Sequence, residues 1–120
     1  MKVKTADLTS PALDWAVATV EGLTEENSWT TVEIFKAVRA AGGYLYSTQW
    51  SQGGPIIERE GIYLRANDTV TEWAAGALRK NRLDKKPGPL FYAKTPLVAA
   101  MRCFVSSKLG DEVDVPEELL

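Results

Sequence analysis

A short stretch near the middle of the chain, residues 47–56, combines residue types that could bind a flat anionic ligand. It reads STQWSQGGPI and places a tryptophan and two amide side chains directly before a Gly-Gly-Pro turn. Paired glycines allow successive main-chain amides to approach a ligand and form an anion-binding concavity. The indole offers a stacking surface, and one base–aromatic stack contributes about 1–3 kcal/mol. The predicted ligand-binding residues of this stretch are Thr48, Trp50, Ser51, Gln52, Gly53 and Gly54.

Three further residues are assigned to the same predicted site. Tyr46 is a second stacking surface, and Arg59 could hold a phosphate through two parallel hydrogen bonds. Arg102 interrupts an otherwise apolar helix, so its charge must reach solvent, a carboxylate or an anionic ligand. For Arg102 the alternative to phosphate binding is a structural ion pair with Asp14 or a glutamate. For the stretch as a whole, the alternative is a plain turn that leads into a strand while Trp50 covers the core.

The absence of histidine restricts the chemistry that this chain can perform. With no histidine and one cysteine, Cys103, the chain cannot form a Ser-His-Asp or Cys-His triad, nor a zinc site of imidazole and thiolate ligands. Glu58 and Glu60 could act as an acid–base pair or bind a divalent cation, but we expect them to form an exposed, solvated strand face instead. We therefore predict a protein without enzymatic activity, metal or cofactor.

Length and composition are those of one ordinary globular domain covering residues 1–120. Hydrophobic residues make up 45% of the chain and charged residues 25%, and the net charge is −2. This charge provides no general attraction to nucleic acid, and the basic run 79–86 is typical of a solvated helix end. No apolar run is long enough to span a membrane, and no signal peptide begins the chain. A single cysteine suits a reducing compartment, so we expect a cytoplasmic protein.

Hydrophobic periodicity and helix-capping signals predict an α+β fold, with about three helices packed on a small, mostly antiparallel sheet. The clearest helix begins with Thr95 as cap and Pro96 in its first turn and ends before Gly110. The predicted helices are residues 9–22, 30–41, 68–80 and 95–109; the predicted strands are residues 1–5, 56–64 and 112–115; residues 44–55 and 83–92 are predicted loops, and Gly61 a bulge or turn.

Three segments carry a family resemblance: ALDWAVA at residues 12–18, WSQGGPIIEREGI at residues 50–62, and TPLVAAMRCFVSSKLGDEVDVPEEL at residues 95–119. Together and in this order they resemble the NinX-like family of phage and prophage proteins. The resemblance implies an accessory phage protein, expressed early, that acts in the cytoplasm of the bacterial host. It supplies no established activity and no site residues. Residues 23–46 and 66–94 do not take part in it.

These observations lead to two hypotheses about function. The first is a non-enzymatic phage accessory protein that binds and sequesters a small phosphorylated nucleotide-like ligand, and so would inhibit host antiviral signalling. A homo-oligomer is expected, because small chains form deep pockets most easily between subunits. The alternative is an inhibitor or adaptor that binds a host protein through an aromatic surface patch around Trp29 and Tyr44, with the acidic tail 111–118 as an electrostatic guide.

Overall fold

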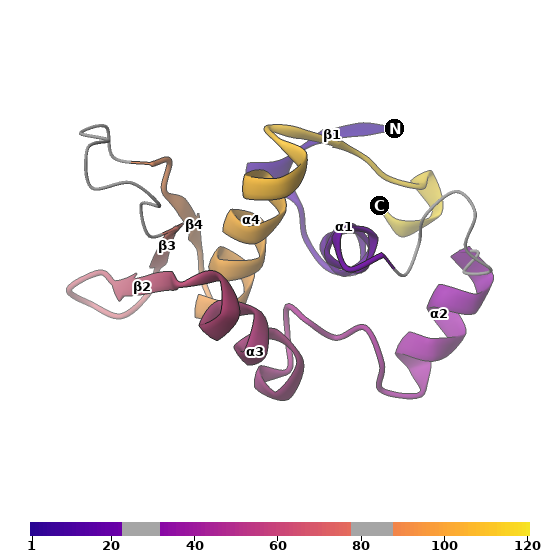
Figure 1. The fold of residues 1–120 in the computed structure, drawn as a ribbon, viewed down its shortest axis with the longest axis horizontal. Coiled ribbons are helices and arrows are strands. Elements are labelled where there is room, and N and C mark those ends of the chain that lie inside the picture. Colours follow the sequence, from indigo (N-terminus) through magenta and orange to yellow (C-terminus); the bar gives the residue numbers. More distant parts are fainter. Residues whose placement is uncertain (23–31, 78–87) are drawn as a thin grey trace.

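The computed structural model describes residues 1–22, 32–77 and 88–120 and has an α+β fold, which confirms the predicted class (Figure 1). Four helices and five short strands are formed by these residues. The helices are α1 (Ala12–Val20), α2 (Val32–Ala40), α3 (Trp50–Glu60) and α4 (Pro96–Leu109). The strands are β1 (Lys2–Lys4), β2 (Ile62–Ala66), β3 (Trp73–Ala77), β4 (Phe91–Ala93) and β5 (Glu112–Asp114), with 3-10 turns at Thr5–Asp7 and Glu117–Leu119.

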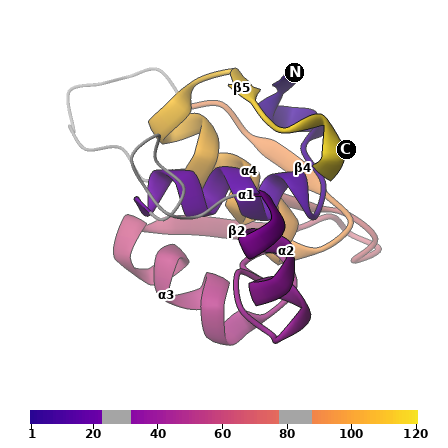
Figure 2. The ribbon, with the colours of Figure 1, turned by 90° about the vertical axis from the view of Figure 1, so that its right-hand side faces the viewer.

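Helix α4 is the centre of the core, as its nearly continuous apolar sequence predicts. The Thr95 side chain caps it by accepting a hydrogen bond from the Val98 amide at 3.3 Å, and Pro96 occupies its first turn. Figure 1 shows α4 between the three-stranded sheet on one side and α1 on the other. Turning the molecule by 90° shows α3 and α2 on the same side of α1 and α4 (Figure 2). Met101 and Phe104, two large side chains of α4, are buried.

The strands form two antiparallel sheets. One contains β2, β3 and β4 in that order, with Leu64 opposite Ala75 and Ala75 opposite Phe91. The other pairs β1 with β5 and joins the two ends of the chain, with Val3 opposite Val113. Both terminal strands were expected from the sequence. None of the helices that the described residues form is long and apolar enough to cross a membrane.

The region from Trp50 to Glu60 is a helix, so the predicted loop 44–55 and the predicted strand 56–64 are both wrong there. Two glycines and Pro55 are poor helix formers, and packing against α4 outweighs their low propensity. The helix buries Gly53 and Ile56, which are three residues apart and so lie on one face. Gly61 ends it in the left-handed conformation, at φ 65°, and β2 begins at the next residue.

The predicted helix 68–80 is also wrong over its described residues, which form a turn followed by β3. The Asn67 side-chain oxygen accepts hydrogen bonds from the amides of Thr71 and Glu72 at 2.8 and 3.1 Å. These bonds close the hairpin between β2 and β3 in the region where the sequence predicts the start of a helix. Residues 78–80 of this prediction, 83–87 of the predicted loop 83–92, and 30–31 of the second predicted helix lie outside the described residues.

Candidate functional site

The two glycines of the predicted binding stretch lie inside α3 and do not form an anion-binding concavity. The Gly53 amide donates to the Gln49 carbonyl at 2.9 Å, which is a helical hydrogen bond. The indole of Trp50, the first residue of the helix, remains 54% exposed, and Ser51 beside it is exposed too. The alternative in which Trp50 covers the core is therefore wrong as well.

Gly53 has a packing role instead. A Cβ built on it would clash with the carbonyl oxygen of Tyr46 and would lie 2.7 Å from Cδ2 of Leu97 in the first turn of α4. The missing side chain therefore lets α3 approach both the preceding segment and α4. Gly54 differs, because a Cβ there would meet its nearest neighbour, an atom of the Trp50 ring, at 3.9 Å. Packing therefore requires a glycine at position 53 but not at position 54.

Of three other predicted residues, Gln52 and Thr48 bond to the segment before α3, and Tyr46 is a partly buried member of it. The Gln52 side chain accepts from the Leu45 amide and donates to the Gly42 carbonyl, both at 2.7 Å. Thr48 donates from its hydroxyl to the Leu45 carbonyl at 3.5 Å. Tyr46 is partly buried, and this burial, followed by the negative charge of Glu21, raises the pKa of its phenol. Gln52 is consequently engaged by the chain itself.

Arg59 is paired within the chain. Its guanidinium donates to the Glu21 carboxylate at 2.6 Å, also contacts Glu60 at 3.4 Å, and lies 5.7 Å from the ring centre of Phe104. The hydrogen bond to Glu21 is the main cause that raises the pKa of Arg59. Glu60 in turn lies 3.6 Å from Lys108. A phosphate would have to compete with these carboxylates for the guanidinium.

Arg102 bridges two main-chain carbonyls, and among the described residues it forms no ion pair with Asp14 or a glutamate, the alternative that the sequence offered. Its Nε donates to Leu8 at 2.8 Å and its Nη1 to Tyr92 at 2.7 Å. Burial lowers the pKa of Arg102, while the negative charge of Asp7 acts in the opposite direction. Arg102 thus links the N-terminal segment to the outer edge of β4 through hydrogen bonds.

The Asp14 carboxylate is the centre of a buried polar cluster. The sequence suggested Arg102 as its partner, whereas the structure pairs it with Arg39. Its carboxylate is 0% exposed and accepts from Arg39 Nη2 at 2.8 Å, from Ser10 Oγ at 3.2 Å and from the Ser47 amide at 2.9 Å. These bonds tie α1 to α2 and to the segment before α3. Among the described residues, the buried Arg39 Nε and Ser47 Oγ have no hydrogen-bond partner. Arg39 on α2 and Asp14 on α1 are 25 residues apart, so no local pattern connects them.

The side of the β2–β3–β4 sheet that faces away from α4 carries exposed aromatic and cationic side chains. Side chains alternate along a strand, and the register places the following residues on this outer face: Tyr63, Arg65, Ala74, Gly76 and Tyr92. Tyr63 is 45% and Tyr92 52% exposed, and Leu90 beside them is exposed as well. Sequence reasoning missed this face, although the alternation of IYLRA at 62–66 was a usable signal.

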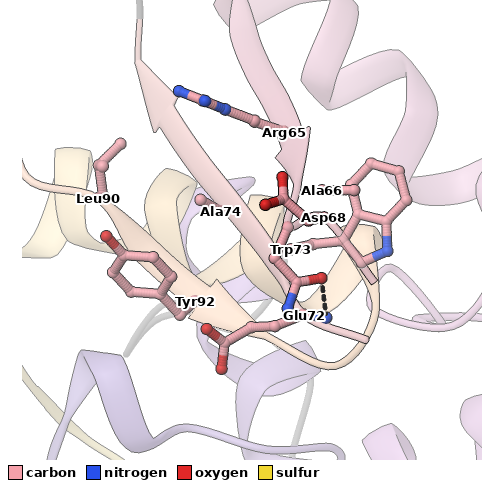
Figure 3. Close-up of a pocket in the computed structure, with 9 residues that line it drawn as sticks. Arg65, Ala66, Asp68, Glu72, Trp73, Ala74, Leu90 and Tyr92 are labelled. Carbon is pink, nitrogen blue, oxygen red and sulfur yellow. Dashed lines mark hydrogen bonds between the residues drawn. The ribbon is translucent and has the colours of Figure 1, made fainter. Parts of the chain in front are cut away.

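A shallow cavity of about 320 Å³ lies at the hairpin end of the outer face. Figure 3 shows Arg65 and Tyr92 on either side of the small Ala74, while the Trp73 indole points to the opposite side. The carboxylates of Asp68 and Glu72 also line it. Among the described residues, no ion pair or side-chain hydrogen bond engages the Arg65 guanidinium or these two carboxylates. The cavity therefore offers both signs of charge beside an aromatic ring.

The part of the chain that the structure describes contains no group of three or more acidic or cysteine side chains placed to hold a metal ion. Comparison with curated proteins finds no significant match. A family model described as "Bacteriophage P22, NinX" matches residues 4–108, which is most of the chain, and confirms the resemblance found in three sequence segments. The chain belongs to the NinX family of bacteriophage P22.

Proposed function

We propose that this NinX-family protein is a non-enzymatic phage accessory protein that binds a host protein through the outer face of its sheet and acts in the bacterial cytoplasm. The observation that carries the proposal is the exposure of Tyr63 and Tyr92 on that face, beside the cavity between Arg65 and Tyr92. Tyrosine and arginine are among the residues most enriched at the energetic centres of protein interfaces. Aromatic side chains such as tyrosine lose little conformational entropy relative to the area that they bury.

The charges around the cavity favour a protein surface over a phosphorylated ligand. One guanidinium, from Arg65, lies with the carboxylates of Asp68 and Glu72. A phosphate bound to Arg65 would also be repelled by these carboxylates. A protein surface carries charges of both signs and can match such a mixed pattern.

We propose the aromatic patch on the sheet instead of around Trp29 and Tyr44. Trp29 lies outside the described residues. Tyr44 is partly buried and stacks on Phe35 with the ring centres 5.2 Å apart. Its ring therefore already has a partner inside the chain, whereas the rings of Tyr63 and Tyr92 are open to solvent.

Site-specific photo-crosslinking in host cells tests this proposal. A benzophenone amino acid placed at position 92, and separately at position 63, should crosslink to the same host protein, and excess wild-type chain should compete. The combined variant Tyr92→Thr with Arg65→Glu should not compete. Position 109, an exposed leucine at the end of α4, is the control and should not yield this product. Absence of a common product at 63 and 92, or the same product at 109, would refute the proposal.

A second candidate function is the sequestering of a small phosphorylated nucleotide-like ligand, which would inhibit host antiviral signalling. The exposed indole of Trp50 supports it, because a base could stack there beside the exposed Ser51 and Thr48. Calorimetric titration with AMP and with cyclic di-AMP tests it directly. Binding that is lost in Trp50→Ala, with the unfolding midpoint unchanged, would favour this candidate over the first. Titrations without heat of binding for both nucleotides would remove its support.

A further inference from the structure

The outer edge of β2 presents main-chain groups that no described segment pairs with. The Asn67 amide donates to the Glu72 carbonyl at 2.9 Å, and this bond sets the phase of the β2–β3 ladder. Because hydrogen bonding alternates along an antiparallel pair, the main-chain groups of Tyr63 and Arg65 point toward β3. Those of Ile62, Leu64 and Ala66 therefore point outward. Within the described chain, no backbone hydrogen bond is formed on that side of β2.

The remaining sheet edges are protected in ways that β2 is not. On the opposite edge of the same sheet, Arg102 occupies the Tyr92 carbonyl. The small β1–β5 sheet carries charged side chains along both of its strands, which read KVK and EVD. Charged residues, prolines and bulges are the usual means of preventing edge-to-edge pairing. Strand β2 reads IYLRA; it contains no proline, and its one charged side chain, Arg65, lies on the outer face of the sheet.

We propose that β2 is a dimerisation edge, on which a second copy of this chain pairs antiparallel through its own β2 with Leu64 opposite the partner's Leu64. This register follows from symmetry. A two-fold axis at Leu64 lets Ile62, Leu64 and Ala66 use all of their outward groups in hydrogen-bonded pairs with the same residues of the second copy. A shift by one residue would set outward groups against groups already bonded to β3.

The side chains of β2 are self-complementary in this register. Tyr63 falls opposite the partner's Arg65 on the outer face, and Ile62 falls opposite the partner's Ala66 on the side of α4. Tyr63 and Arg65 occupy non-hydrogen-bonded positions, where opposite Cβ atoms are about 4.5–5.5 Å apart. The Tyr63 ring lies across Gly76, since a Cβ on Gly76 would be 2.5 Å from its hydroxyl oxygen. Its other side is exposed and can receive a guanidinium.

Each two-fold dimer would contain this tyrosine–arginine pair twice, so a change at either position acts twice. Pairing would also join the two outer faces into one continuous surface. Tyr63 and Arg65 belong to both this dimer edge and the proposed host-binding face. The inference itself rests on the unpaired β2 edge, and sedimentation and amide exchange of the purified chain test it without the host protein.

Sedimentation equilibrium over a concentration series, with a charge-exchange set of variants, tests the dimer. Wild type should be a concentration-dependent dimer. Arg65→Glu and Tyr63→Lys should each weaken association by roughly tenfold or more, the first by removing the cation from the ring and the second by opposing two cations. The double variant should recover much of the loss, because the lysine introduced in one copy would face the glutamate introduced in the other. Urea unfolding of each variant at low concentration verifies that the monomer still folds.

Amide hydrogen exchange localises the interface. When the concentration is raised through the dimer transition, the amides of Leu64 and Ala66 should become protected. The Arg65 amide is bonded to β3 in either state, so it is the internal reference and should change little. A wild-type chain that remains monomeric at every soluble concentration would overturn the proposal. So would a dimer that leaves Leu64 and Ala66 unprotected, or a double variant that is no better than the single ones.

Discussion

On the α4 side of the three-stranded sheet, the guanidinium groups of Arg59 and Arg102 are engaged by other groups of the chain, whereas the guanidinium of Arg65 on the outer face is not engaged by any described residue. Arg102 binds the carbonyls of Leu8 and Tyr92, and Arg59 binds Glu21. On the outer face, Arg65 has no ion pair among the described residues, and the Tyr63 and Tyr92 rings are about half exposed.

This difference separates residues that stabilise the fold from residues that are available for binding. A buried donor or acceptor that loses its partner costs about 1–3 kcal/mol, whereas a typical exposed substitution changes stability by less than about 0.5 kcal/mol. Substitutions on the α4 side should therefore lower the free energy of unfolding. Substitutions on the outer face should change binding and leave that energy unchanged.

The largest effect is expected at Gly53. In Gly53→Ala the new Cβ meets a main-chain oxygen, which cannot move aside as a flexible side chain would, so we expect a loss of about 3 kcal/mol in urea unfolding. The adjacent Gly54→Ala is the matched control. Its Cβ has space, and replacing a helical glycine by alanine should stabilise the protein by about 0.5–1 kcal/mol. Equal effects of the two substitutions would contradict the packing role of Gly53.

The same glycine pair explains why the predicted site was partly wrong. Gly-Gly-Pro has low helix propensity, so local reasoning favours a turn with exposed amides. The contact that decides the conformation is the close approach of Gly53 to the Tyr46 carbonyl and to Leu97 on α4. Leu97 is distant in sequence, and no local signal reports its proximity. The indole of Trp50 is exposed at the start of α3, so of the two roles that the sequence left open for it, covering the core is wrong.

Removing the guanidinium of Arg102 should have the next largest effect. Arg102→Met keeps much of the apolar stem but leaves the carbonyls of Leu8 and Tyr92 without their donor, so we expect a loss of about 2 kcal/mol. It should also open the β4 edge, and self-association should rise in sedimentation experiments. Arg102→Lys should recover part of the stability. An unfolding midpoint unchanged in Arg102→Met would show that the bridge is not structural.

Which elements could be predicted depends on how local their causes are. Helix α4 was predicted because its cap, its first-turn proline and its terminal glycine all belong to the helix itself or its immediate flanks. The sequence predicts a helix at β3, because Val70, Trp73 and Ala77 can share one helical face. The pairing with β2 and β4 that makes this segment a strand depends on residues outside it. Arg102 was correctly expected to need a partner, but its carbonyl partner Leu8 is 94 residues away.

Cys103 is buried on the α4 side, and its thiol should make the stability of the protein depend on pH. Burial raises the pKa of its thiol from 9.0 to about 11. As the pH rises, the thiol of the unfolded chain releases its proton before the buried thiol of the folded chain does. The contribution of the thiol to stability is therefore fully present below pH 9 and is lost as the pH rises toward 11. Unfolding free energies of wild type should therefore fall more steeply between pH 9 and 11 than those of Cys103→Ala. Parallel curves would indicate that the thiol is not shielded.

The smallest effect on stability is expected at Tyr92, and it is the sharpest test of the difference between the faces. Tyr92→Thr keeps a residue suited to strands, and its main-chain carbonyl can still accept from Arg102, so the unfolding free energy should change by less than about 0.5 kcal/mol. Crosslinking to the host protein from position 63 should nevertheless be lost, because an exposed aromatic at the centre of an interface contributes far more to binding than to folding. A stability loss close to that of Arg102→Met would show instead that the outer face also supports the fold, and the separation of the two faces would no longer hold.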